Sequence, residues 1–97
     1  MNVEFRSRRL QRRFEQAAEA TRAWGPEVGR RYVQRVAALV AAEQIQDIYS
    51  VRAFDLHPLT GERSGQHAMR LTGQVRLILT IEGNRRIVVE EVTDYHG

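Results

Sequence analysis

The sequence predicts an α+β fold, in which an N-terminal helical hairpin packs on an antiparallel sheet of three or four strands. Apolar residues recur every three or four positions in the first half of the chain, whereas apolar and polar residues alternate in the second half. A chain of 97 residues is expected to form one domain over residues 1–97. Its core will be small, so an active site should be a surface groove.

A helical hairpin is expected after a short edge strand at residues 2–6. Ser7 is a suitable N-cap for the first helix, and Gly25 ends it after these apolar positions: Leu10, Phe14, Ala17, Thr21 and Trp24. Pro26 suits the first position of a second helix, whose apolar stripe is Val28, Tyr32, Val36, Leu39 and Val40. Residues 43–50 follow as a further helical turn.

Four extended segments are expected in the second half, at residues 53–56, 66–71, 75–81 and 87–93. Pro58 ends the first segment or marks an edge of the sheet, because proline has no N–H group to donate to a strand ladder. The segments should pair as antiparallel neighbours.

The central hairpin allows two registers. A three-residue loop at residues 72–74 sets Arg70 directly opposite Arg76, whereas a two-residue loop at residues 72–73 points the two arginines to opposite faces. We favour three residues, because only that register sorts apolar from polar side chains. Opposed cations destabilise a sheet, so an anion should sit between them, unless each arginine binds a carboxylate from this set: Glu62, Glu90 and Glu91.

The charge distribution favours an anionic partner. The net charge is +3, all fifteen basic residues are arginine, and ten of them lie in residues 1–52. A basic patch begins the first helix and consists of Arg8, Arg9, Arg12 and Arg13, although such a run can also be a solvated helix face. The absence of cysteine excludes disulfides and thiol chemistry. No apolar run suits a membrane helix or signal peptide, so we expect a soluble cytoplasmic protein.

Two stretches carry the residues suited to chemistry: residues 56–76, with His57 and several arginines, and the closing Asp94-Tyr95-His96. These residue types suit the cleavage of RNA by attack of its own 2′-hydroxyl. That reaction needs a base to take the hydroxyl proton, an acid to protonate the departing 5′-oxygen, and cations for the extra charge on the phosphorane. Two histidines, with an ordinary pKa of about 6.5, can act as acid and base near neutral pH. Arginines supply fixed donors to phosphate oxygens. Asp94 could orient a neighbour, and Tyr95 could donate to phosphate or stack on a base.

Six short motifs follow one another in the second half: Leu56-His57-Pro58-Leu59, Gly61-Glu62-Arg63-Ser64-Gly65, Met69-Arg70-Leu71, Gly73-Gln74, Arg76-Leu77-Ile78 and Asp94-Tyr95-His96. Their combination and order resemble the HigB-type toxins of the RelE/ParE superfamily. The resemblance implies a RelE-like fold and a ribosome-dependent endoribonuclease that needs no metal or other cofactor. The positions that match the family's catalytic set are His57, Arg76, Asp94, Tyr95 and His96.

The expected substrate-binding residues are Arg70, Arg63, Arg8, Arg9 and Arg12. The partners implied by the resemblance are the ribosome, messenger RNA and a cognate antitoxin of the helix-turn-helix type, with DNA contacted only through the antitoxin complex. The chain departs from the family pattern at Thr60, Gln66, His67 and Val75, where lysine and aromatic residues are common. We interpret His67 as structural in preference to a ligand of a three-histidine metal site.

Two other functions remain open from the sequence. The chain could be a non-enzymatic member of the superfamily that binds a protein such as gyrase, or that acts as a corepressor with its antitoxin. It could also be a small nucleic-acid-binding module, in which the basic helix is the main surface and the histidines are incidental.

Overall fold

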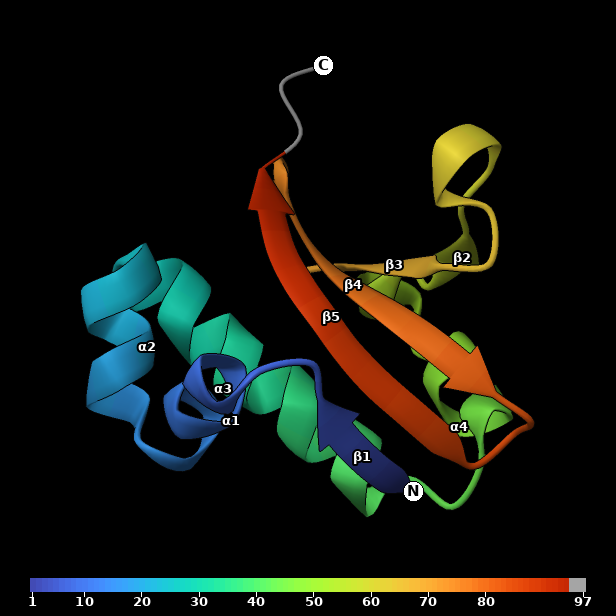
Figure 1. Ribbon diagram of the computed structural model, residues 1–97, viewed down its shortest axis with the longest axis horizontal. Helices are drawn as coiled ribbons and strands as arrows, with labels where there is room; N and C mark the ends of the chain where they lie inside the picture. The colour runs from blue at the N-terminus through green and yellow to red at the C-terminus, as the bar shows by residue number, and fades with distance from the viewer. Residues whose placement is uncertain (95–97) are drawn as a thin grey trace.

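The computed structural model describes residues 1–94 and confirms the α+β class. One sheet has the strand order β1-β5-β4-β3-β2 (Figure 1), with bounds β1 Asn2–Phe5, β2 His57–Pro58, β3 His67–Arg70, β4 Val75–Glu82 and β5 Arg86–Asp94. The sheet therefore has five strands rather than three or four. Strands β2 to β5 pair antiparallel, but β1 runs parallel to β5, a long-range pairing with no local signal in the sequence.

The helices are α1 (Arg8–Glu15), α2 (Ala17–Trp24), α3 (Pro26–Ala41) and α4 (Ile45–Tyr49). The Ser7 hydroxyl accepts from the Leu10 N–H at 3.2 Å, which confirms the predicted cap. The single first helix that we expected is two, because the backbone at Gln16 is extended, with φ −128°. Gly25, at φ 86°, ends α2, and Pro26 begins α3 as predicted. Within residues 1–94, no helix is long and apolar enough to cross a membrane.

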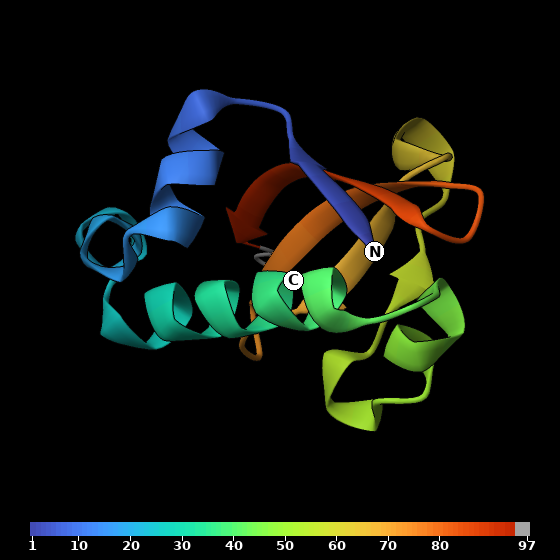
Figure 2. The same cartoon turned by 90° about the horizontal axis from the view of Figure 1, so that it is seen from below.

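The helices pack against one face of the sheet, which we call the inner face (Figure 2). Its buried core joins Tyr32, Val36 and Leu39 of α3 to Leu71, which follows β3, and to these strand residues: Met69, Leu77, Leu79, Ile87 and Val89. Helices α2 and α3 approach closely at Gly29, where a Cβ atom would lie 2.8 Å from the Thr21 backbone nitrogen. The Tyr32 hydroxyl donates to the Leu10 carbonyl at 2.7 Å, which ties α3 to α1.

The register of the central hairpin is the predicted one. Arg70 lies opposite Arg76, and Met69 lies opposite Leu77, around a loop at residues 72–74. The prediction of a strand at residues 53–56 is wrong, because the chain forms a 3₁₀ turn there, η1 (Arg52–Phe54). The extended strand starts only at His57, and Pro58 lies on the edge strand β2, as its missing N–H predicted.

Candidate active site on the outer face of the sheet

The face turned away from the helices, the outer face, carries three of the predicted site residues: His57, Arg70 and Arg76. Residues paired across neighbouring strands point to the same side of a sheet. One row across β2 to β5 contains His57, Ala68, Ile78 and Glu91, and the next row contains Arg70, Arg76 and Thr93. The fold therefore places the predicted histidine and both hairpin arginines on a single face. Buried Ala68 and Ile78 form the apolar floor between them.

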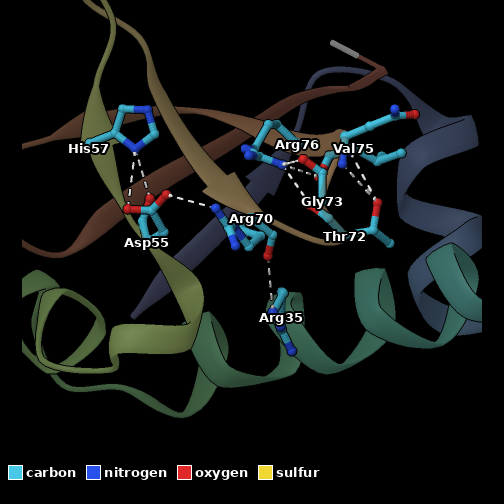
Figure 3. A network of polar contacts seen from close by, with 9 residues as sticks. Arg35, Asp55, His57, Arg70, Thr72, Gly73, Val75 and Arg76 are labelled. Carbon is cyan, nitrogen blue, oxygen red and sulfur yellow. Dashed lines mark hydrogen bonds and ion pairs between the residues drawn. The ribbon is translucent and has the colours of Figure 1, made fainter. Parts of the chain in front are cut away.

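The His57 ring is held by Asp55, a residue that we did not single out from the sequence. Its Nδ1 lies 2.8 Å from the Asp55 carbonyl oxygen and 3.9 Å from the Asp55 carboxylate (Figure 3). A carbonyl oxygen can only accept, so Nδ1 carries the proton, and Nε2 is the ring nitrogen that can exchange a proton with a substrate. The side chain of His57 is 45% exposed, which keeps the ring accessible.

Asp55 also contacts Arg70. A carboxylate oxygen of Asp55 lies 3.7 Å from the Arg70 guanidinium, and both side chains are about half exposed. An exposed pair of this kind contributes only about 0–1 kcal/mol to stability, so its main effect is on orientation. The Arg70 carbonyl accepts from Arg35 Nε at 3.2 Å, which fixes the end of β3 against α3.

Arg76 is bound to the hairpin turn that precedes it. One terminal nitrogen donates to the carbonyl oxygens of Thr72 at 2.6 Å, Gly73 at 3.2 Å and Val75 at 3.2 Å. The Thr72 hydroxyl accepts from the Val75 N–H at 3.1 Å and closes the turn. A guanidinium has five N–H donors in a rigid fork, so anchoring one nitrogen leaves other donors for a phosphate.

The two opposed arginines are thus held by different acceptors. Arg70 is paired with Asp55, and Arg76 with the carbonyls of the turn, as Figure 3 shows. Two of the three carboxylates that the sequence offers as partners bind other arginines: Glu90 binds Arg6 at 2.8 Å, and Glu91 lies 3.4 Å from Arg63. The acceptors reduce the cost of setting two like charges across a ladder.

Arg63 lies at the end of the short 3₁₀ turn η2 (Gly61–Arg63). It donates to the Gln66 side chain at 3.1 Å and to Glu91 at 3.4 Å, so the turn is tied to the row that contains His57. Its charge is partly balanced by Glu91, and its side chain is 37% exposed. Arg63 thus borders the outer face.

The remaining predicted arginines belong to a different surface. Arg8, Arg9 and Arg12 lie on α1, where they line a cavity of about 360 Å³ together with Arg13 and Glu19. The cavity is formed by α1 and α2 rather than by the strands. The structure therefore divides the predicted cations into two groups, one on the sheet and one on the helices.

His67 lies on β3, beside the edge strand β2. Its side chain points to the inner face, whereas that of His57 points to the outer face. Its Nδ1 is buried and has no hydrogen-bond partner, and its ring packs edge-on to Tyr49 with centroids 6.5 Å apart. Burial lowers the pKa of His67 below its ordinary value, and the nearby His57 lowers it further. Within residues 1–94, no group of three or more potential ligand side chains is arranged to hold a metal ion.

Of the last three predicted residues, Asp94 belongs to the described part of the chain. Asp94 is the final residue of β5 and lies opposite Val75, while Thr93 lies opposite Arg76. Tyr95 and His96, both predicted as catalytic, fall outside the described residues. Because paired residues point to the same side of a sheet, Asp94 lies on the side of Val75, whereas Thr93 shares the outer face with Arg76.

Comparisons with solved structures identify the fold. YafQ from E. coli superposes with a TM-score of 0.61 at 10% sequence identity, covering 96% of this chain and 91% of YafQ. The YoeB/ParE toxin from Agrobacterium tumefaciens superposes at 0.58 and 14% identity, covering 99% of this chain and all of that toxin. The YoeB–YefM complex from Staphylococcus aureus superposes with a TM-score of 0.57 at 15% sequence identity, covering all of this chain and 98% of the matched chain. The fold is thus that of the RelE-like toxins.

A match along the sequence assigns the family. A family model described as the RelE-like toxin of the type II toxin–antitoxin system HigB matches residues 3–96. The chain therefore belongs to the HigB-like toxins, as its motifs predicted. No curated protein matches the sequence.

Proposed function

We propose that this HigB-like toxin is a ribosome-dependent endoribonuclease that cleaves messenger RNA. One observation carries the proposal: His57, Arg70 and Arg76 share the outer face of the sheet, in adjacent rows of the β2–β3–β4 ladder. A proton-exchanging ring beside two fixed guanidinium groups is what cleavage by a 2′-hydroxyl requires. Membership of the HigB-like family supports the same activity.

In the proposed reaction, the RNA 2′-hydroxyl attacks the adjacent phosphorus and the bond to the 5′-oxygen breaks. His57 exchanges a proton through Nε2, because Nδ1 is bound to the Asp55 carbonyl. Arg76, with Arg70 beside it, stabilises the charge that develops on the phosphate oxygens. We assign the second proton transfer to His96, with Asp94 as the orienting group and Tyr95 as a phosphate donor or stacking surface.

We further propose a ribosomal docking role for the α1 arginines. Arg8, Arg9 and Arg12, with Arg13, concentrate positive charge around one cavity, which suits the phosphates of ribosomal RNA. Arg63 would contact the message at the rim of the outer face. The toxin would act in the cytoplasm, where messages are translated, and a cognate helix-turn-helix antitoxin would block it; DNA would be contacted only through that antitoxin. The likeness to the YoeB–YefM complex supports a protein partner of this kind.

A translating extract tests the activity directly. Message cleavage is mapped by primer extension, with the wild-type toxin, with ribosomes present or removed, and with two variants. His57→Ala and a chain lacking residues 94–96 should each lose at least about a hundredfold in cleavage rate, the usual size of an acid–base contribution. Glu62→Gln, which removes an exposed charge from the same region, should cleave at the wild-type rate.

Two results would contradict the proposal. One is a fully active His57→Ala variant whose cleavage matches the wild type. The other is growth arrest by the wild-type toxin without any cut in the message, which would favour the non-enzymatic, protein-binding member of the superfamily. Thermal unfolding of each variant establishes that a loss of cleavage is not a loss of fold.

A further inference from the structure

The segment before β2 makes an unusual turn at Asp55. Its backbone angles are φ 47° and ψ 47°, the left-handed region, and it is the only non-glycine residue within residues 1–94 with a positive φ. Among L-residues, aspartate and asparagine adopt this conformation most readily. A residue held in this conformation beside a candidate site suggests a function.

The turn aims three oxygen atoms of one residue at two site residues. The Asp55 carbonyl lies 2.8 Å from His57 Nδ1, one carboxylate oxygen lies 3.9 Å from the same nitrogen, and the other lies 3.7 Å from the Arg70 guanidinium. Figure 3 shows Asp55 between the two side chains. Its neighbour Phe54 stacks under Arg35, whose guanidinium lies 4.8 Å from the ring centroid.

We propose that Asp55 is the positioning residue of this site. Its left-handed backbone sets the tautomer of His57, and its carboxylate holds the His57 ring and the Arg70 guanidinium at a fixed separation on the outer face. This assignment rests on the proposed nuclease function. It adds a residue that the motifs do not contain.

The need to end the 3₁₀ turn η1 does not explain why residue 55 has a carboxylate side chain. The 3₁₀ turn closes through the Asp55 backbone N–H, which donates to the Arg52 carbonyl at 3.1 Å, and this bond needs no side chain. Glycine would adopt the left-handed conformation with less strain. The feature that glycine lacks is the carboxylate, and within residues 1–94 the ion pairs of that group are with the two site residues, His57 and Arg70.

Arg35 of α3 contacts both segments that carry the proposed pair, the end of β3 with Arg70 and the turn before Asp55. It donates to the Arg70 carbonyl and stacks on Phe54, so α3 ties the strand that carries Arg70 to the segment that carries Asp55. Arg70 is therefore fixed through its backbone by α3 and through its side chain by Asp55. A change at Asp55 should move the Arg70 side chain while leaving β3 in place.

Two substitutions separate the backbone role from the charge. Asp55→Asn keeps the left-handed turn and the carbonyl bond but removes the charge. Nitrogen-15 NMR of the imidazole should still show His57 protonated at Nδ1, while the cleavage rate falls by on the order of a hundredfold, as expected when reacting groups are misplaced. Asp55→Ala disfavours the left-handed turn, so the Nδ1-protonated form should become a minority as well.

The controls distinguish this proposal from the function on which it rests. Glu62→Gln should leave both the His57 spectrum and the cleavage rate unchanged. Wild-type cleavage by Asp55→Asn, together with an unchanged His57 spectrum in Asp55→Ala, would overturn the positioning role. If His57→Ala cleaves like the wild type, the nuclease function fails, and the tautomer change in Asp55→Ala still decides whether Asp55 orients the ring. Melting temperatures of the variants exclude unfolding as the cause.

Discussion

His57 and His67 are neighbours across the β2–β3 pair, yet their side chains lie on opposite faces of the sheet. On the outer face, the His57 Nδ1 is bound to the Asp55 carbonyl and the ring is nearly half exposed. On the inner face, the His67 Nδ1 is buried without a partner, and burial lowers its pKa. Because side chains alternate between faces along each of the two paired strands, the same residue type meets two different environments.

The difference shows what each face contributes. The outer face supplies polar partners that orient its histidine and arginines, whereas the inner face supplies packing against the helices. A ring with one anchored nitrogen and one accessible nitrogen suits proton transfer. A half-buried ring whose Nδ1 is buried and unpaired suits space filling, and that polar atom costs stability. Substitutions on the two faces should therefore affect different measurements.

The largest effect is expected for Arg76 on the outer face. Arg76→Ala should lower the rate of message cleavage by about a hundredfold to a thousandfold, because a preorganised donor to the phosphate is lost. Arg76→Lys should recover only part of the rate, since an ammonium cannot bind the turn carbonyls and a phosphate as a fork. Single-turnover cleavage in a translating extract measures both.

Arg85→Ala is the matched control, because Arg85 is an exposed arginine in the turn between β4 and β5. It should cleave like the wild type. An Arg76→Ala variant as active as Arg85→Ala would show that the outer face does not bind the scissile phosphate.

Much of this face was predictable, and the reason is the period of a strand. The two-residue alternation of residues 66–81 sorts apolar Met69 and Leu77 from Arg70 and Arg76, so it determines the register and places the arginines together. Helix boundaries at Gly25 and Pro26 followed from local conformational preferences. These signals are local, and the structure agrees with them.

Asp55 was not predictable in the same way. We expected residues 53–56 to be extended, and the 3₁₀ turn followed by a left-handed aspartate depends on tertiary contacts to Arg35 and Arg70. The available signal was weak: an aspartate, which tolerates the left-handed region, two residues before a candidate catalytic histidine. The parallel pairing of β1 with β5 also escaped detection, because it joins residues more than eighty positions apart.

A smaller effect is expected for the inner-face histidine. His67→Phe should raise the free energy of unfolding by about 1 kcal/mol, because it removes a buried nitrogen without a partner. In the wild type, the lowered pKa of His67 means that the unfolded chain binds a proton more readily. The free energy of unfolding should therefore decrease as the pH falls from the unfolded-state pKa of about 6.5 to the lower folded-state pKa. The His67→Phe variant lacks this group, so its free energy of unfolding should decrease less over the same pH range.

Urea unfolding at pH 7.5 and pH 5.5 measures this difference, and message cleavage serves as the second readout. Cleavage by His67→Phe should equal that of the wild type. A loss comparable to that of His57→Ala would end the distinction between the two faces, because it would give the inner-face ring a part in the reaction.

The smallest effect is expected outside both faces, on α1. Arg12→Gln removes one of the arginines around the cavity of α1 and α2, and each phosphate contact contributes about 0.7–0.9 to the slope of log affinity against log salt concentration. The slope for ribosome binding should therefore decrease in magnitude by about that amount, while single-turnover cleavage by the bound toxin stays constant. Arg30→Gln, an exposed arginine of α3 that does not line the cavity, is the control. Equal slopes for the two variants would remove the docking role from α1. A lower cleavage rate for Arg12→Gln would mean that the α1 arginines take part in the reaction, which would contradict a role in docking alone.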